Sequence, residues 1–394
     1  MYSGRSIQEK YDLKDINASE IVAKIVKGET VDLDHVRILG NLDIGKLDLP
    51  KRHIGRTDLE INSLGFEENI SIIASIIKII NSEIQGASNF CEAAFDQEVD
   101  FSGSRFTGVA DFRGAKFHGP TDFSWSQFGE DALFSGSQFT GGALFDGCRF
   151  NERADFLGFR VRGPTEFRGC QFNKKADFVR SRFSGYIVDF SESEFRGNTE
   201  FIRSMFGEDT YFNQCVFIGD LDFSGSQFKG DVLTFKHSKF SNSRSQEDAC
   251  RRAKNILEKN GDREESGYHF YQEMDAKRKQ RPWYLRYPEF VFIQMIFGYG
   301  VHPGWLMAWW GIIVTAFGSL YWIVKGIDGA TISECIKFSF ATAIAPGYIA
   351  SVINPGNAGY RLIPEYHAIA MAETIVGTFL WAGFIATFAR KYMK

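Results

Sequence analysis

The chain has 394 residues, enough for two or three domains, and a formal net charge of −4. A charge so near zero does not favour nucleic acid as a partner, because proteins that bind it carry an excess of positive charge. The six cysteines include no CxxC pair, which argues against a disulfide framework and against a zinc site. Phenylalanine is the unusual residue, with 39 copies.

The first predicted element is an amphipathic helix at 18–29, with the sequence ASEIVAKIVKGE. After it, aliphatic residues follow steps of six and five in two separate runs, at Ile38, Ile44 and Leu49 and at Ile79 and Ile84, the second of which leads into Phe90. A repeat stack needs a cap, because its open end exposes unpaired strand edges. We therefore expect the first domain, 1–30, to be a helical cap.

Phenylalanine continues these steps from Phe90 to Phe240, so the period is eleven residues, as in VDFSGSRFTGV followed by ADFRGAKFHGP. We call this series of regularly spaced positions the ladder and each of its positions a rung. Phenylalanine occupies 27 rungs, out of 39 phenylalanines in the chain, and Val161 occupies the one rung that lacks phenylalanine. A small or β-branched residue, such as Ala93 or Val99, stands two places before each rung. Gly and Pro in nearly every unit argue against a helix, where each would cost about 1 to 3 kcal/mol. The sequence therefore predicts a solenoid of short extended pieces.

The units ADF, TDF, TEF, LDF and VDF resemble the pentapeptide-repeat family, whose units read A(D/N)(L/F)xx. The resemblance implies a right-handed quadrilateral β-helix over 31–240, with the rung residue and the small residue both inside. Twenty-eight rungs at four per coil imply seven coils, a rod on the order of 34 Å long. Three cysteines fall on the small position and are expected to be buried, namely Cys148, Cys170 and Cys215.

Some pentapeptide solenoids imitate DNA, but that role needs a free, acidic, dimeric rod. Here the outward positions mix Arg, Lys, Asp and Glu. We expect instead a rigid scaffold or interaction surface for an unknown cytoplasmic ligand or protein, and no nucleic-acid partner.

The composition changes after Phe240. Asn260 and Gly261 separate two helical patterns, at about 247–259 and 262–279, which predicts a charged helical hairpin within a linker at 241–300. Basic residues gather near its end, at Lys277, Arg278, Lys279, Arg281 and Arg286. Proximity to anionic lipid headgroups would account for this run.

The domain at 301–394 is predicted to lie in a membrane. Residues 305–324 carry no charge and span about 30 Å, the thickness of a bilayer core. Aromatic residues toward the ends of this segment, Tyr321 among them, are expected at the membrane interface. A second span at 368–389 contains one charge, Glu373. Basic residues crowd the outer flanks of both spans, so the positive-inside rule predicts a multi-pass plasma-membrane protein with both termini in the cytoplasm.

Between the spans, 333–345 is apolar but too short to cross a bilayer, which indicates a re-entrant segment. Pro346 and Gly347 then break any helix. Backbone that is not helical is tolerated at membrane depth only inside protein or along a water-filled cavity. The order of span, re-entrant helix, extended loop and span therefore predicts a pore.

The stretch KFSFATAIAPGYIA at 337–350 resembles the potassium-channel pattern YFSFVTLTTVGYGD without a gap. The E-x3-G that begins the family's second helix is matched by Glu373 and Gly377. The motif GYGVHPGW at 298–305 is similar to GYGERPWR, which precedes the first helix in pentapeptide-repeat proteins with such pores. The resemblance implies a two-helix pore-loop domain, a homotetramer, and monovalent cations as the conducted ions. Its pore loop and filter would be Thr342, Ala343, Ile344, Ala345, Pro346, Gly347, Tyr348 and Ile349.

The filter departs from that pattern. Potassium filters coordinate the ion with backbone carbonyls and a threonine hydroxyl, but Ala345 has no hydroxyl. Pro346 fixes φ near −65°, and the β-branched Ile349 resists the positive φ that the second Gly allows. We therefore expect that the four-site potassium filter cannot form, which leaves a less selective pore or a blocked one.

Three further residues are candidates for the pore. Glu373 is either a carboxylate that attracts cations or supports the filter, or a structural hydrogen-bond partner of the pore helix. Gly377 and Gly383 are either gating hinges or small residues at helix contacts.

Two functions follow from the sequence. The first is a weakly selective cation channel with a cytoplasmic regulatory solenoid, and the alternative is a non-conducting membrane-anchored scaffold. The sequence shows no nucleophile with a base, no phosphate loop and no metal-ligand spacing, so no enzyme, cofactor or metal site is predicted.

Overall fold

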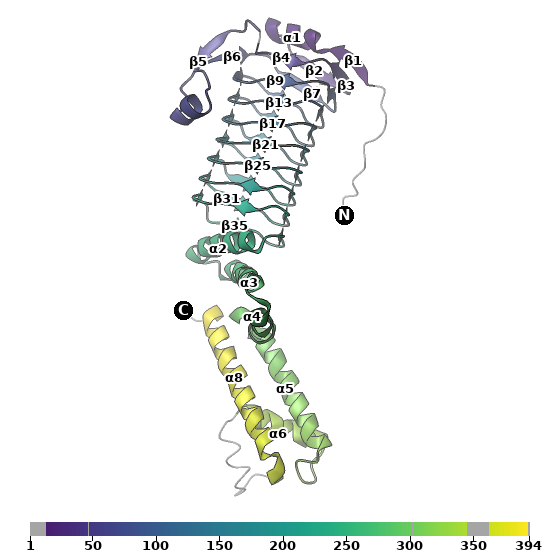
Figure 1. Cartoon of the computed structure of the whole chain (residues 1–394), viewed down its shortest axis with the longest axis vertical. Coiled ribbons are helices and arrows are strands. Elements are labelled where there is room, and N and C mark those ends of the chain that lie inside the picture. Colours follow the sequence, from purple (N-terminus) through teal and green to yellow (C-terminus); the bar gives the residue numbers. More distant parts are fainter. Residues whose placement is uncertain (1–12, 46, 302, 345–361, 393–394) are drawn as a thin grey trace. The chain divides into compact units, whose positions relative to one another are not determined.

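The computed structural model describes residues 13–45, 47–301, 303–344 and 362–392. The chain divides into two compact units, Met1–Glu273 and Met274–Lys394, and each is described by itself. Figure 1 shows that the first unit is a stack of strands closed by helices and that the second is helical.

Four β-sheets run along the first unit, and consecutive strands in each sheet pair in parallel, except for the antiparallel pair β5 and β6. Sheet A contains β1 (Lys14–Asn17), β3 (Val36–Leu39), β8 (Glu83–Ile84), β12 (Arg105–Phe106), β16 (Gln127–Phe128), β20 (Arg149–Phe150), β24 (Gln171–Phe172), β28 (Glu194–Phe195), β32 (Val216–Phe217) and β36 (Lys239–Phe240). Sheet B contains β2 (Val31–Asp34), β7 (Ile77–Ile80), β11 (Val99–Asp100), β15 (Thr121–Asp122), β19 (Ala143–Leu144), β23 (Thr165–Glu166), β27 (Ile187–Asp189), β31 (Asp209–Tyr211) and β35 (Leu233–Thr234).

The other two sheets complete each coil. Sheet C contains β4 (Leu42–Asp43), β9 (Ser88–Asn89), β13 (Ala110–Asp111), β17 (Ala132–Leu133), β21 (Ala154–Asp155), β25 (Ala176–Asp177), β29 (Thr199–Glu200) and β33 (Leu221–Asp222). Sheet D contains β5 (Lys51–His53), β6 (Asn69–Ile73), β10 (Ala93–Phe95), β14 (Lys116–Phe117), β18 (Gln138–Phe139), β22 (Arg160–Val161), β26 (Arg182–Phe183), β30 (Met205–Phe206) and β34 (Gln227–Phe228).

The unit is therefore a β-solenoid of the right-handed type with about ten coils, since its longest sheet has ten strands. The seven coils predicted from the phenylalanine rungs cover only the part of the stack from Phe90 to Phe240. Aliphatic coils extend the stack toward the N-terminus, where Ile38 pairs with Ile84 and Ile84 pairs with Phe106.

Stacked phenylalanine rings fill the solenoid. Rings one coil apart lie nearly parallel, as in Phe128 and Phe150, whose centroids are 4.9 Å apart. Rings in adjacent columns meet edge to face, as in Phe123 and Phe134 at 5.4 Å and 84°. Aromatic pairs favour both geometries over a perfect face-to-face sandwich. The prediction that the rung and the small position both lie inside is confirmed, because residues such as Ala93, Val99 and Ser104 are also buried.

One coil reverses this arrangement. Val161 occupies the rung, as predicted, while the small position before it holds Phe159, which is not among the predicted rungs. The Phe159 ring is fully buried and lies 5.2 Å from the rings of Phe139 and Phe156. The large and small side chains have exchanged places, so the volume of the coil is kept.

Both ends of the solenoid are covered. Helix α1 (Ala18–Lys27) buries Ile21 and Ile25 against the first coils and ends at Gly28, whose φ of 72° glycine tolerates well. The segment predicted as a purely helical cap also contains strand β1, which pairs with β3. At the other end, α2 (Ser243–Lys259) contributes Ala253 and Leu257 to the solenoid core.

Helix α2 and helix α3 (Arg263–Lys279) are the two helices predicted at 247–259 and 262–279. Helix α2 begins four residues earlier than predicted. The reason is that the side chain of Asn242 accepts a hydrogen bond from the Arg244 N–H and so caps the helix.

A long connection leaves the side of the solenoid between β5 and β6. We call residues 54–68 the flap; it contains a short π-helix, η1 (Leu59–Ser63). The Phe66 ring of the flap lies so close to Gly114 and Gly136 that a Cβ at either glycine would be within 3.2 Å of it. Glycine at these two positions therefore lets the flap lie directly on the coils.

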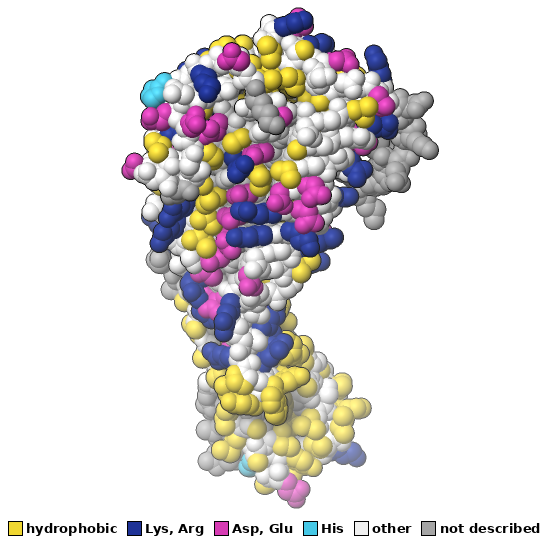
Figure 2. All heavy atoms as spheres, turned by 45° about the horizontal axis from the view of Figure 1, so that its top comes forward, with side chains coloured by type: hydrophobic (Ala, Val, Ile, Leu, Met, Phe, Trp, Pro, Cys, Tyr) yellow, Lys and Arg dark blue, Asp and Glu magenta, His cyan; other side chains and the backbone are white. Residues whose placement is uncertain are grey.

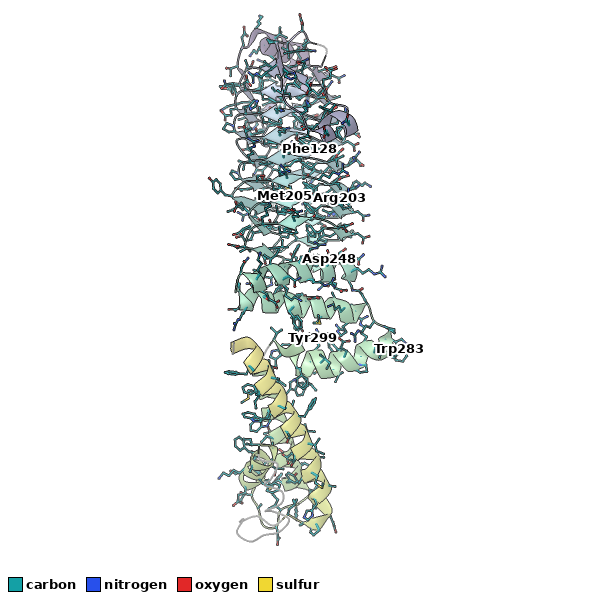
Figure 3. The ribbon with its side chains drawn as sticks, turned by 90° about the vertical axis from the view of Figure 1, so that its left-hand side faces the viewer. Phe128, Arg203, Met205, Asp248, Trp283 and Tyr299 are labelled. Carbon is teal, nitrogen blue, oxygen red and sulfur yellow. The ribbon has the colours of Figure 1, made fainter. Side chains whose placement is uncertain are left out.

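The second unit begins within the last turns of α3 and continues through α4 (Trp283–Pro288), the π-helix η2 (Glu289–Ile296) and the 3₁₀-helix η3 (Gly298–Gly300). Trp283 points outward from α4 and is 73% exposed (Figure 3). The remaining helices are α5 (Pro303–Ile323), α6 (Ile332–Ile344), η4 (Pro364–Tyr366) and α8 (His367–Tyr392). The spans predicted at 305–324 and 368–389 lie on α5 and α8, and the segment predicted as re-entrant lies on α6.

Helices α5 and α8 are long and apolar enough to cross a membrane. In the most apolar 18-residue stretch of each helix, the buried share is only 28% for α5 and 22% for α8. A core helix of a soluble protein would be mostly buried, so the exposed apolar surface favours membrane association. Figure 2 shows hydrophobic side chains gathered on the visible face of this unit, whereas charges of both signs mix over the solenoid.

Candidate functional site

Three helices of the second unit meet at one carboxyl group. Glu373 lies in the first two turns of α8 and is fully buried. The Tyr321 hydroxyl of α5 donates to its Oε2 at 2.8 Å, and the Ser339 hydroxyl of α6 hydrogen-bonds its Oε1. Both carboxyl oxygens therefore have a partner, which offsets part of the large cost of placing this group among apolar helices.

Helix α6 turns one face toward that carboxyl. Its buried residues Cys335, Phe338, Ser339 and Thr342 recur at helical spacing. The Ser339 Oγ also lies 2.8 Å from the Val314 carbonyl oxygen of α5. The edge of the Tyr321 ring packs on Phe338 at 5.3 Å. This short helix is thereby fastened to α5 and to α8.

The start of α6 is fixed by its own residues. Both the N–H and the hydroxyl of Thr331 donate to Oε2 of Glu334, at 2.7 and 2.8 Å. A residue three places into the helix thus reaches back to the capping residue, one half of a capping box. The sequence specifies this end of the helix locally, whereas its depth between α5 and α8 depends on tertiary contacts.

Glycines let the three helices approach closely. A Cβ on Gly377 would lie 2.6 Å from the Ala343 carbonyl oxygen and 2.8 Å from its Cα. A Cβ on Gly318 of α5 would lie 2.8 Å from the Ile336 Cα. At Gly383 the neighbour is the Phe297 ring, 2.4 Å away. Gly377 and Gly383, predicted as hinges or as contact residues, both lie at helix contacts.

The predicted filter is described only at its beginning. Thr342 and Ala343 are buried at the end of α6, and Ile344 is partly exposed. Thr342 Oγ1 has no hydrogen-bond partner among the described residues, which is rare for a buried hydroxyl. Ala345, Pro346, Gly347, Tyr348 and Ile349 lie outside the described residues.

The sequence does not predict the contact of Tyr321 with Glu373. Tyr321 lies near the end of its helix, where aromatics were predicted at the membrane interface, and it is fully buried within the chain and reaches Glu373. A helical stripe gives the signal that could have found it, because Val314, Gly318 and Tyr321 follow each other at steps of four and three and are all buried.

Among the described residues, no group of three or more His, Cys, Asp or Glu side chains could hold a metal ion. The three cysteines predicted to be buried fillers are buried, and each Sγ donates to a backbone carbonyl one coil away, as Cys148 does to Phe123.

A comparison with protein families matches the model for pentapeptide repeats (9 copies) at residues 101–149, 145–194 and 190–239. The matched ranges lie inside the solenoid, which is therefore built of pentapeptide repeats. Comparisons with curated proteins and with solved structures find no significant match.

Proposed function

We propose that this chain, a solenoid of pentapeptide repeats joined to two apolar helices, is the subunit of a weakly selective cation channel. The observation that carries the proposal is the attachment of α6 to both long helices through Glu373, Tyr321 and Ser339. Helix α6 has 13 residues and rises about 20 Å, too little to cross a bilayer core of about 30 Å. A simple membrane anchor has no need of a third helix that is too short to span the bilayer and is attached to both spanning helices.

In this proposal four copies surround a central path for monovalent cations. The C-terminal end of α6 carries Thr342 and leads directly into the filter segment. The last carbonyl groups of a helix attract cations, so four such ends around an axis would favour cation entry. The exposed apolar faces of α5 and α8 would contact lipid and neighbouring copies, and the solenoid and both termini would lie in the cytoplasm.

Glu373 then supports the pore instead of lining it. Both of its oxygens are engaged and none of its surface is exposed within the chain. Its role is to hold the pore helix at a fixed depth. Gly377 and Gly383 likewise serve close helix packing, because a side chain at either position would collide with a neighbour.

The test is a planar-bilayer recording of the purified chain under asymmetric KCl and then under bi-ionic KCl and NaCl. We expect unitary currents whose reversal potential shows cation selectivity with little discrimination between potassium and sodium. Glu373→Gln should lower the open probability, since it weakens the attachment of α6, and leave the unitary conductance nearly unchanged. Glu365→Gln is the matched control, because that carboxyl is exposed at the start of the same helical segment.

A non-conducting membrane-anchored scaffold is the second candidate, favoured by the replaced filter residues Ala345, Pro346 and Ile349. Electrical silence from a preparation shown to be tetrameric would favour the scaffold over the channel. A reduced unitary conductance in Glu373→Gln, with Glu365→Gln unchanged, would instead place Glu373 on the ion path.

A further inference from the structure

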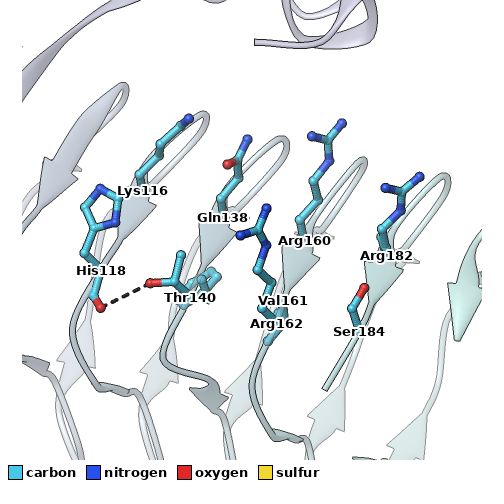
Figure 4. A pocket seen from close by; sticks show the side chains of 10 residues that line it. Lys116, His118, Gln138, Thr140, Arg160, Val161, Arg162, Arg182 and Ser184 are labelled. Atoms are coloured by element: carbon cyan, nitrogen blue, oxygen red, sulfur yellow. Dashed lines mark hydrogen bonds between the residues drawn. The ribbon is translucent and has the colours of Figure 1, made fainter. Parts of the chain in front are cut away.

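A basic pocket lies on the outer surface of the solenoid, along four consecutive strands of sheet D. The outward residues of β14, β18, β22 and β26 form one column, and the residues two places later form a second (Figure 4). Together they line a cavity of about 270 Å³. The polar and charged lining residues are Lys116, Gln138, Arg160, Arg182, His118, Thr140, Arg162 and Ser184.

Positive charge in this pocket is concentrated and largely uncompensated. Four of its side chains are Lys or Arg, and none of the residues that line it is acidic. Lys116, Arg162 and Arg182 form no ion pair with any described residue. Several basic side chains elsewhere on the solenoid pair with acidic neighbours, as Lys175 does with Asp177 and Glu200.

The pKa of Lys116 is consistent with this excess of charge. Burial lowers this pKa most and Arg56 lowers it next, while Glu60 opposes them. Arg160 and Arg162 lower it further by smaller amounts. Cations held near one another in a partly buried site repel, and a bound anion relieves that repulsion.

A carboxylate of the flap already touches the edge of the pocket. Glu60 Oε1 accepts a hydrogen bond from Gln138 Nε2 at 2.6 Å, and its Oε2 lies 3.4 Å from Arg160 Nη1. Arg160 also donates to the Thr57 hydroxyl at 2.9 Å. This edge of the pocket therefore accommodates anionic oxygens. Arg162 and Arg182 have no acidic partner among the described residues, so they can bind a further anion.

We propose that the pocket binds a small anion that carries two or more clustered phosphate groups. Arginine forks recognise phosphate oxygens in pairs, and a row of them along a repeat suits adjacent phosphates. The Ser184 hydroxyl at the far end of the second column adds a neutral donor. The cavity is slightly smaller than the ~300 Å³ at which drug-sized pockets begin, which fits a diphosphate or triphosphate group. The same chemistry is offered by a soluble phosphate compound and by a phosphorylated lipid headgroup.

Calorimetric titration of inorganic pyrophosphate into the full-length chain, in a neutral detergent at low salt, tests the proposal. We expect saturable binding that weakens as salt rises. Arg162→Gln and Arg182→Gln should each lower the affinity about tenfold, since each removes charge-assisted hydrogen bonds. The control is Arg105→Gln, because Arg105 is an exposed outward residue on β12 of sheet A, outside the pocket. Unchanged thermal unfolding would show that the variants fold.

A second variant tests the part assigned to the flap. Glu60→Gln removes the negative charge beside Arg160 and should tighten pyrophosphate binding several-fold. A second arm replaces pyrophosphate with vesicles of phosphatidylcholine and phosphatidylinositol bisphosphate, whose headgroup carries clustered phosphates. Binding only to these vesicles, sensitive to Arg162, would assign the anion to a lipid headgroup. Absence of binding in both arms, or equal loss in the Arg105 and Arg162 variants, would overturn the proposal. Because the readout is heat or vesicle binding, it does not depend on ion conduction.

Discussion

At the scale of single residues, Phe159 and Val161 exchange the two interior positions of their coil. Phe159→Ala should destabilise the solenoid by about 3 to 5 kcal/mol through the cavity that it leaves. Val161→Phe alone should cost about 1 to 3 kcal/mol, because Phe159 already fills the space. The double variant restores the arrangement of the other coils, so its cost should be well below the sum of the two.

Denaturant unfolding of the four chains in this double-mutant cycle measures that coupling. Tyr186→Ala, at an aromatic residue that is 83% exposed, serves as the control and should change stability by less than about 0.5 kcal/mol. Additive costs at Phe159 and Val161 would contradict the exchange of volume.

His269 predicts a pH dependence. It is buried between α3 and the last coil, where its Nε2 lies 3.3 Å from the Thr234 hydroxyl. Burial lowers its pKa from 6.5 to about 4, against a smaller opposing effect of Glu265. Between pH 6.5 and 4 the unfolded chain binds more protons than the folded chain, so stability falls as the pH falls through this window. The free energy of unfolding that depends on a neutral His269 is present in full above pH 6.5, and at most about 3 kcal/mol of it is lost at low pH.

Amide hydrogen exchange in α3, followed from pH 7 to pH 4, measures this effect after correction for the intrinsic exchange rate. Protection should decrease with pH in the wild-type chain, and much less in His269→Gln. His237→Gln, at an exposed histidine next to the same helix, should behave like the wild type. An identical pH profile in the His269 variant would show that other groups govern the docking of α3.

At the scale of secondary-structure elements, the contact between α6 and α8 depends on the absence of a side chain at Gly377. A Cβ there would meet backbone atoms of Ala343, which cannot move without shifting α6. Gly377→Ala should therefore destabilise the second unit, whereas Gly311→Ala should be neutral or stabilising by up to about 1 kcal/mol. Gly311 also lies inside a long helix, but a Cβ there meets nothing within 4 Å.

Thermal unfolding in detergent, followed by tryptophan fluorescence, compares the two glycine variants. Most of the seven tryptophans lie in the second unit, so this signal reports mainly on it. Equal stability of the Gly377 and Gly311 variants would mean that α6 and α8 separate easily. Such a result would favour a hinge over a packing role for Gly377.

At the scale of the whole molecule, the proposed pore requires four copies. The apolar residues of α5 and α8 that are exposed among the described residues include Ile312, Ile323 and Ile375, and neighbouring copies would cover part of this surface. Native mass spectrometry from detergent should give a complex of four times the 44.6 kDa chain. A monomer or dimer would contradict the tetramer and, with it, the central ion path. The pyrophosphate site lies within one solenoid and would survive that result.

The sequence alone determined the solenoid. Each coil contacts only its neighbours, so the same interior requirement recurs at a fixed spacing and is readable as a period of eleven. The two apolar helices and the short segment between them are visible for a similar reason, because length and lack of charge are properties of a continuous stretch.

Only the tertiary structure decided which residues that are distant in the sequence come into contact. Glu60 contacts Arg160 although a hundred residues separate them, and Tyr321 of α5 donates a hydrogen bond to Glu373 of α8 although 52 residues separate those two. Arg160 lies on the repeat, but Glu60, Tyr321 and Glu373 do not, so each pair depends on where a non-repeating segment places a side chain. The flap and the buried carboxyl therefore have no periodic signature, since the contacts that form them join segments whose spacing in the sequence carries no structural rule. The basic pocket differs, because its lining residues recur every 22 residues, one coil apart, as Lys116, Gln138, Arg160 and Arg182 do.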